Sequence, residues 1–269
     1  MMKTSVLGWL FGGILVLSSC KYGTDEVRVT KIKDLKRMDA VVCHLDYDYK
    51  GRLSAYGNTP IEYGRNEIRI GRMDWDYRGE QLLSAAYFFS GGEVFRSEAR
   101  CLWMTDSSEV EVCKEVDYEI CGDTIKMEST YLSVPDRHPV RQVFARYIYD
   151  EEGNLKEIIS RYVNADRETS VCHSYYNYDK NVQCTSNLNM QAYFVDVEGP
   201  DVFFYLLLKM GDKFQGQKLP NRIHYCVNHG KSEYDAEGLY RLDGEWLDKG
   251  EVISDDTKLK ARLEFSYSE

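Results

Sequence analysis

The sequence has 269 residues, of which 43% are hydrophobic and 29% are charged, which excludes a wholly disordered chain and allows one large domain or two small ones. The net charge of −10, without any run of lysines and arginines, excludes the basic surface that nucleic-acid-binding proteins usually carry. Tyrosine is frequent, with 21 residues against 5 prolines, and an enrichment in aromatic residues favours β-strands.

Residues 1–19 have the features of a secretory signal peptide. Lys3 lies in a short basic start, and the apolar run from Val6 to Leu17 is shorter than the roughly 20 residues that a membrane-spanning helix needs. The run ends in Leu17-Ser18-Ser19-Cys20, which resembles the lipobox of bacterial lipoproteins, where the cysteine is lipidated and becomes the first residue. We therefore expect residues 1–19 to be removed and Cys20 to attach the protein to a membrane. An ordinary signal peptide followed by a chance cysteine is the alternative.

The residues after Cys20 predict the location and the domain organisation. Lys21 stands where an aspartate retains some lipoproteins at the inner membrane, so we expect an outer-membrane lipoprotein of the cell envelope that faces the periplasm or the cell surface. Residues 20–40 form the lipidated cysteine and a charged tether, with Val27–Ile32 as a candidate first strand. Residues 41–269 form a single β domain.

From Val41 onward, apolar and polar residues alternate with the period of two that half-buried strands show. A Tyr-Asp-x-x-Gly motif recurs between these stretches, and in one copy Trp75 replaces the tyrosine. In a hairpin turn, the aspartate accepts backbone N–H groups and the glycine adopts a left-handed conformation. A calcium loop is the alternative, but each copy has too few acidic residues for one. The predicted turn residues are Asp48, Gly51, Asp76, Gly79, Asp150, Gly153, Asp235 and Gly238.

Two further hairpins follow from the spacing of apolar residues. A turn at Gly122-Asp123 places Glu119 opposite Lys126, a pair of opposite charges. A turn centred on Ser107 places Cys101 opposite Cys113, which predicts a disulfide, with a pair of buried thiols as the alternative.

The segment Val202–Leu208 is apolar on both faces and interrupts the alternation. Asp201 is a suitable N-cap and Gly211 a suitable end, so the segment predicts one short helix near 201–211 that plugs or caps the sheet. A strand buried on both faces is the alternative.

The sequence carries no motif of a serine hydrolase, a zinc protease or a phosphate-binding loop, so no catalytic residue is assigned. His224, Cys226 and His229 are the best metal ligands available, but no fourth ligand accompanies them, so neither a metal nor another cofactor is predicted. Aromatic residues can stack on sugar rings, with packing inside the sheet as the alternative. The candidates for stacking are Trp75, Tyr77, Trp103 and Trp246.

The hairpins resemble the tyrosine–aspartate repeats of long bacterial surface and toxin shells. Together with the lipobox, the segments Asn187–Phe194, Phe203–Leu206 and Leu219–Ile223 resemble a family of bacterial lipoproteins of unknown function with a porin-like fold. The resemblance covers residues 41–269. It implies an all-β fold, an antiparallel meander of repeated hairpins curled into a barrel-like or open half-barrel sheet, and it implies no catalytic residue.

A porin-like shape does not require a pore. Arg146 and Arg161 interrupt predicted strands with charges, although in a membrane barrel they could face a polar lumen. The sequence predicts a lipid-anchored envelope protein and favours binding of a glycan, a peptide or an envelope partner over catalysis. A polysaccharide hydrolase with paired carboxylates and a purely structural envelope lipoprotein are the alternatives.

Overall fold

A computed structural model describes residues 24–31, 41–74, 77, 79–104, 108–164, 167–184, 186, 188–211, 216–228, 232–254 and 259–267. The predicted signal peptide, the lipidation residue Cys20, the stacking candidate Trp75 and the turn residue Asp76 lie outside the described residues.

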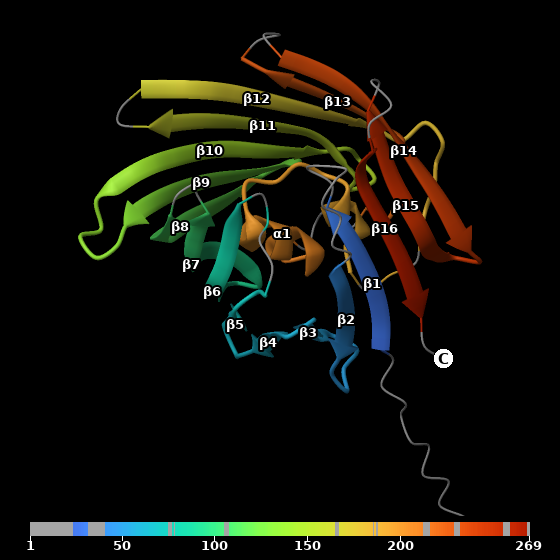
Figure 1. The fold of residues 1–269 in the computed structure, drawn as a ribbon, viewed down its shortest axis with the longest axis horizontal. Coiled ribbons are helices and arrows are strands. Elements are labelled where there is room, and N and C mark those ends of the chain that lie inside the picture. The colour runs from blue at the N-terminus through green and yellow to red at the C-terminus, as the bar shows by residue number, and fades with distance from the viewer. Residues whose placement is uncertain are drawn as a thin grey trace, which may run out of the picture.

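The described strands form one antiparallel sheet in which each strand pairs with its neighbours in the sequence, as the all-β meander prediction requires (Figure 1). β1 (Thr24–Lys31), in the segment expected to be a tether, pairs with both β16 (Leu259–Tyr267) and β2 (Val41–Tyr47), so the strand order closes into a barrel. The other strands are β3 (Leu53–Tyr56), β4 (Thr59–Tyr63), β5 (Glu67–Ile70), β6 (Glu80–Ser90), β7 (Glu93–Met104), β8 (Glu109–Cys121), β9 (Thr124–Ser133), β10 (Pro139–Tyr149), β11 (Leu155–Asn164), β12 (Arg167–Asn177), β13 (Arg222–Val227), β14 (Ser232–Asp243) and β15 (Trp246–Ser254).

Two copies of the Tyr-Asp motif form turns of the predicted kind. Asp48 Oδ1 accepts the backbone N–H groups of Lys50 at 2.8 Å and Arg52 at 3.0 Å, and Gly51 has a φ of 73°. Asp150 Oδ1 likewise accepts the N–H groups of Glu152 and Asn154, and Gly153 has a φ of 79°. The aspartate thus satisfies the N–H groups of the turn while the glycine adopts the positive φ that closes it. In the copy with Trp75, Gly79 has a φ of 80°.

The copy at Asp235 and Gly238 is not a turn, which corrects the prediction. Both residues lie inside β14, where Asp235 pairs with His224 of β13. A Cβ atom added to Gly238 would lie 2.2 Å from the carbonyl oxygen of Pro220. The glycine therefore admits a close backbone neighbour, a requirement that local sequence does not distinguish from a turn.

The register of β7 and β8 corrects the predicted disulfide. Cys101 pairs with Val112, and Arg100 pairs with Cys113, one residue away from the predicted register. Because successive side chains of a strand point to opposite faces, a one-residue shift separates the two thiols, and both cysteines are free. The next hairpin has the predicted register, with Glu119 opposite Lys126.

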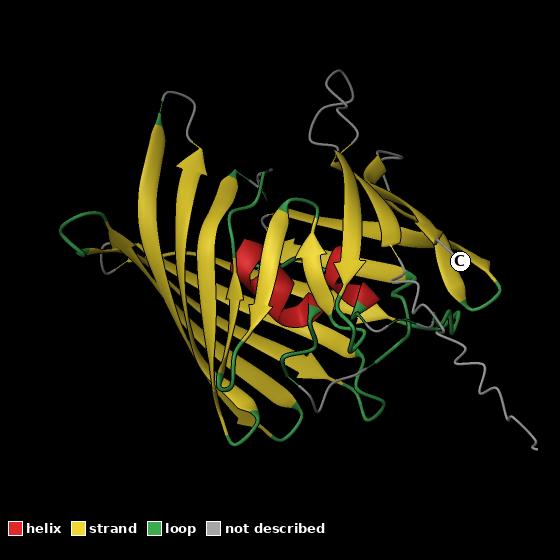
Figure 2. Ribbon diagram, turned by 90° about the horizontal axis from the view of Figure 1, so that it is seen from below, coloured by secondary structure: helices red, strands yellow, loops and turns green. Residues whose placement is uncertain are grey.

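A short helix fills the inside of the barrel (Figures 1 and 2). α1 (Pro200–Leu207) follows the 3-10 helix η1 (Met190–Tyr193), and every residue of α1 is buried. The helix expected near 201–211 therefore starts with Pro200 in its first turn, has Gly199 rather than Asp201 as its N-cap, and ends before Gly211. Proline suits the first turn because it lacks an N–H group that the helix would leave unpaired.

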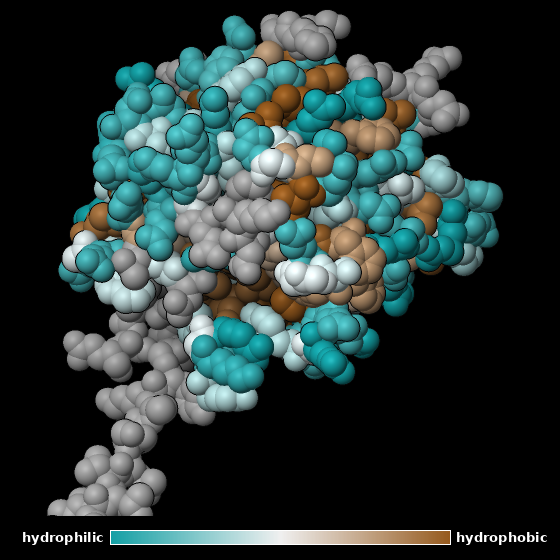
Figure 3. Space-filling view, turned by 180° about the vertical axis from the view of Figure 1, so that it is seen from behind, coloured by the Kyte–Doolittle hydropathy of each residue, from teal (hydrophilic) through white to brown (hydrophobic). Residues whose placement is uncertain are grey.

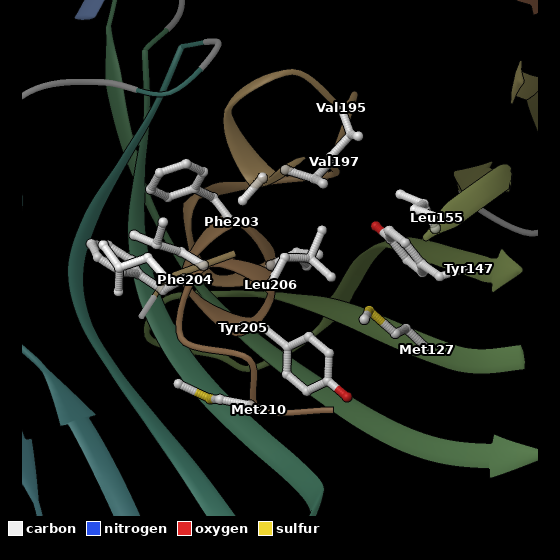
Figure 4. Packing of buried hydrophobic residues seen from close by; sticks show 14 of the residues in the cluster. Met127, Tyr147, Leu155, Val195, Val197, Phe203, Phe204, Tyr205, Leu206 and Met210 are labelled. Carbon is white, nitrogen blue, oxygen red and sulfur yellow. The ribbon is translucent and has the colours of Figure 1, made fainter. Parts of the chain in front are cut away.

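Buried hydrophobic side chains pack α1 against the strands (Figure 4). The ring of Tyr205 stacks on Tyr118 of β8 with 4.6 Å between the ring centroids. Phe204 makes an edge contact with Tyr56 of β3 at 5.6 Å. The core of this barrel is thus the packed space between the helix and the inner faces of the strands. In the described part of the chain, no helix has the length and apolarity needed to cross a membrane.

Candidate functional site

The two faces of the long strands differ in polarity. In β8, Val112, Val116 and Tyr118 point inward and are buried, whereas Asp117 and Glu119 point outward and are exposed. Neighbouring strands follow the same alternation, and a space-filling view of one face shows mostly hydrophilic residues with several hydrophobic patches among them (Figure 3). The outside of this part of the barrel therefore suits water rather than hydrocarbon.

Arg146 and Arg161 belong to this outer face. Their neighbours Ala145 and Ser160 are buried toward the inside, and both arginines are exposed. The possibility that these arginines face a polar lumen is therefore wrong. Alternation along the strand separates the two faces, but only the closed sheet decides which face is the outer one.

A groove of about 520 Å³ lies on the outer face of β8–β12. Its apolar floor consists of Phe144, Ile159 and Val171. The guanidinium of Arg161 lies over the ring of Phe144, 4.8 Å from its centroid. Charged residues of both signs surround this floor, namely Asp117, Glu119, Lys126, Glu128, Arg146 and Arg161.

Like charges stand directly opposite each other in this groove. The register pairs Asp117 with Glu128 and Lys126 with Arg146. Lys126 has a partner, because its Nζ atom lies 3.0 Å from Glu119 Oε2. Among the described residues, no ion pair joins Asp117, Glu128 or Arg146 to another side chain. Opposed like charges are unfavourable in a sheet, so the groove retains unbalanced charges of both signs.

A second groove, of about 430 Å³, lies on the outer face of β4–β8, and Arg137 from the turn after β9 also lines it. Its arginines already have protein partners, since Arg100 pairs with Glu111 and Arg137 with Glu115. The groove over β8–β12 is therefore the better candidate for binding a charged ligand.

A buried ionic cluster joins α1 to the wall of the barrel. Lys114 Nζ of β8 lies 2.8 Å from Asp201 Oδ1 of α1, and both side chains are fully buried. Glu80 lies beside them, and its Oε1 atom, like Asp201 Oδ2, has no hydrogen-bond partner in the described structure. A Cβ atom at Gly199 would lie 3.0 Å from Asp201 Oδ1 and 3.3 Å from both Glu80 Oε1 and Lys114 Nζ. Glycine at the start of the helix therefore leaves room for the charged groups of the cluster.

Burial and neighbouring charges set the protonation of this cluster. Burial raises the pKa of Glu80, and the attraction of Lys114 only partly opposes the rise. Burial would lower the pKa of Lys114, but the Asp201 carboxylate outweighs this effect and holds that pKa well above its ordinary value. The cluster thus keeps a charged lysine–aspartate pair and favours a neutral Glu80.

The raised pKa of Glu80 predicts a pH dependence of stability. Above the ordinary glutamate pKa of 4.5, the folded protein holds a proton that the unfolded chain releases, so the free energy of unfolding falls as pH rises through this range. Glu80→Gln removes this contribution, and its stability relative to the unsubstituted protein is expected to increase with pH. Urea unfolding of both proteins at a series of pH values measures the difference.

Glu119→Gln is the matched control, because hydrogen bonds with Cys121 and Lys126 lower the pKa of Glu119. Its relative stability is expected to change with pH in the opposite direction. Parallel pH profiles for Glu80→Gln and the unsubstituted protein would contradict the neutral Glu80.

The stacking candidates that the structure describes, Tyr77, Trp103 and Trp246, do not share one exposed surface. Tyr77 stacks on Phe203 of α1 at 5.9 Å between ring centroids, and Trp103 contacts Tyr131 at 5.2 Å. Trp246 is 45% exposed and begins β15. Tyr77 and Trp103 therefore contribute to the core rather than to a sugar-binding platform.

Two of the residues considered as metal ligands, His224 and Cys226, lie on β13. His224 Nδ1 lies 2.8 Å from Asp235 Oδ1, and His229 lies outside the described residues. Within the described ranges, no three histidine, cysteine, aspartate or glutamate residues are placed to hold a metal ion.

Sequence reasoning missed the groove and the buried cluster, although each left a signal. Lys114 lies two residues from both Val112 and Val116, so all three side chains point to the same face of the strand. A lysine among apolar residues on one face indicates a buried cation. The groove residues lie on separate strands and come together only through the register of the sheet. The sequence shows only that each of them lies on the polar side of its strand.

A family model matches residues 29–265 of the chain. The crystal structure of a porin-like protein from Bacteroides vulgatus ATCC 8482 is similar, with 36% sequence identity, a TM-score of 0.82, and coverage of 90% of this chain and 97% of that one. A second porin-like protein, from Bacteroides uniformis ATCC 8492, has 13% identity and a TM-score of 0.54 over 92% of this chain and 98% of its own, which is a likeness of fold alone. No curated protein matches the chain.

Proposed function

This chain belongs to a porin-like protein family of unknown function, and from that premise we propose that it is a lipid-anchored envelope protein that binds a partner on its outer face. In this proposal it neither conducts solutes nor catalyses a reaction. Cys20 carries the lipid, and the β domain stands in water beside the membrane.

The main support for the proposal is the distribution of polar and apolar residues between the outside and the inside of the barrel. A barrel that spans a membrane has an apolar band outside and, in porins, a polar water-filled channel inside. Here the outward residues of β8–β11 include Asp117, Glu128, Arg146 and Arg161, while the inside is mostly apolar and is packed around α1. This arrangement favours a domain surrounded by water, held to the membrane by another part of the chain.

Binding is favoured over hydrolysis by where the acidic residues lie. Glu80, whose pKa burial raises, and Asp201 are enclosed between α1 and the wall of the barrel, whereas a hydrolase needs its carboxylates in a cleft that admits the substrate. The open groove also holds carboxylates, but they lie on an outward sheet face among charges of both signs and beside an apolar floor. Because Tyr77 and Trp103 pack inward, this groove suits recognition through charge better than stacking on a sugar.

Fractionation of bacterial cells tests the anchoring. The natural chain is compared with Cys20→Ser exported behind the cleavable signal peptide of a protein that is not lipidated. We expect the natural chain in the membrane fraction and the Cys20→Ser protein in the soluble fraction, because the outer face of the domain is charged. Cys113→Ser in the natural chain is the matched control, since Cys113 is a free cysteine of the domain, and is expected to stay with the membrane.

Retention of the Cys20→Ser protein in membranes after washing with high salt and alkali would contradict the proposal. It would mean that the strands themselves, rather than a lipid, hold the domain in the membrane.

A further inference from the structure

The unbalanced charges of the groove over β8–β12 specify a ligand. We propose that this groove binds an extended peptide segment that carries a basic and an acidic side chain two residues apart. The inference rests on the binding function proposed above and names the class of partner.

The charges form two rows across the strands. One row holds the opposed carboxylates of Asp117 and Glu128, and the other holds the opposed cations Lys126 and Arg146. Arg96 and Arg161 lie further along the first row, and Glu119 lies in the second; Arg96 contacts Glu115 and Glu119 contacts Lys126. Glu128 and Lys126 stand two residues apart on β9 and point to the same face, which separates the rows by roughly 7 Å along the strand. An extended peptide repeats its side chains on one face with the same spacing. A peptide lying along β9 therefore brings one side chain to each row.

The two rows require opposite charges from the ligand. A basic side chain between Asp117 and Glu128 relieves their mutual repulsion, and an acidic side chain beside Arg146 supplies the partner that this guanidinium lacks in the described structure. The two carboxylates would repel a polyanion, and a neutral glycan would neutralise the charges of neither row. Charge complementarity therefore favours a peptide segment that carries both a positive and a negative side chain.

The floor of the groove supports the same ligand. Phe144, Ile159 and Val171 form an apolar surface on β10–β12 beside these charged residues, and Arg161 covers the ring of Phe144. The volume of about 520 Å³ is within the usual range of ligand sites, roughly 300–1,000 Å³. Apolar parts of a peptide can lie on this floor while its charged groups reach the rows.

Binding of short synthetic peptides to the full β domain tests the inference. The probes are acetylated and amidated Gly-Lys-Ala-Asp-Gly and Gly-Asp-Ala-Lys-Gly, which present the two charges in either order, and the neutral peptide Gly-Gln-Ala-Asn-Gly. Chemical-shift titration by NMR gives their dissociation constants at low salt. We expect at least one charged peptide to bind about three- to tenfold more tightly than the neutral peptide.

Variants of the groove locate the contacts. Glu128→Gln and Arg146→Gln are each expected to weaken the charged peptide about threefold or more while leaving the neutral peptide unchanged. Glu233→Gln and Arg222→Gln make the same changes at exposed positions of β14 and β13 outside the groove, and are expected to leave both constants unchanged. Arg146→Glu is expected to shift the preference toward a peptide in which lysine replaces the aspartate.

Two results would overturn the inference. One is equal binding of the charged and neutral peptides, including no binding of either. The other is an equal effect of the groove variants and the control variants. Neither result bears on the anchoring of the chain by Cys20, which fractionation decides separately.

Discussion

Lys114→Met is expected to lower the free energy of unfolding at neutral pH by about 3–5 kcal/mol, because it leaves Asp201 as a buried carboxylate without its cation. The methionine keeps most of the volume of the lysine side chain, so the effect reports the lost charge rather than a cavity. Urea unfolding followed by tyrosine and tryptophan fluorescence measures the change.

Two comparisons separate this effect from the loss of any ion pair. Lys126→Met removes the exposed pair with Glu119 and is expected to cost no more than about 1 kcal/mol. Adding Asp201→Leu to Lys114→Met removes the stranded carboxylate and is expected to recover much of the lost stability. Equal costs for Lys114→Met and Lys126→Met, or no recovery in the double variant, would contradict the buried cluster.

Phe204→Ala is expected to lower the free energy of unfolding by about 3–5 kcal/mol, because Phe204 is fully buried between α1 and the strands. Its ring contacts Tyr56 and Phe203, so its removal leaves a cavity beside aromatic rings that are themselves held in place. The same unfolding measurement gives the change.

Phe95→Ala is the matched control. Phe95 is 48% exposed on β7, and its truncation is expected to change stability by less than about 1 kcal/mol. Similar costs for Phe204→Ala and Phe95→Ala would mean that α1 is not a packed part of the core.

The class of fold and several local elements could be predicted from the sequence, because they depend on short-range patterns. The period of two predicts the strands, and the turns at Asp48 and Asp150 follow from the hydrogen bonds of one aspartate and the positive φ of one glycine. The apolar segment that contains Phe204 breaks that period and predicts the helix.

Errors arose where distant residues decide the local structure. Gly238 has the motif of a turn, but it lies in a strand because the carbonyl of Pro220 approaches it. The pairing of Cys101 with Val112 depends on the register of β7 and β8, which the length of the turn between them sets. A register shift of one residue moves every side chain of a strand to the other face.

The candidate site could not be predicted from the sequence for a related reason. Asp117, Glu128 and Phe144 lie on three strands and meet only through the register of the sheet. The sequence also leaves the inner and outer faces of a barrel unassigned, although their polarity separates a domain in water from a pore.

The central claim is that the outer face of the barrel is in water while the chain is attached to a membrane. Labelling of Arg146→Cys with a membrane-impermeant maleimide tests it in the lipidated protein bound to vesicles, after subtraction of the label on the unsubstituted protein. Ser97→Cys, at a fully buried position, is the internal control and is expected to stay unlabelled until the protein unfolds. We expect Arg146→Cys to react at the same rate on vesicles as after the vesicles are dissolved in detergent. Protection of Arg146→Cys on vesicles, with labelling only in detergent, would place this face in lipid and contradict the account.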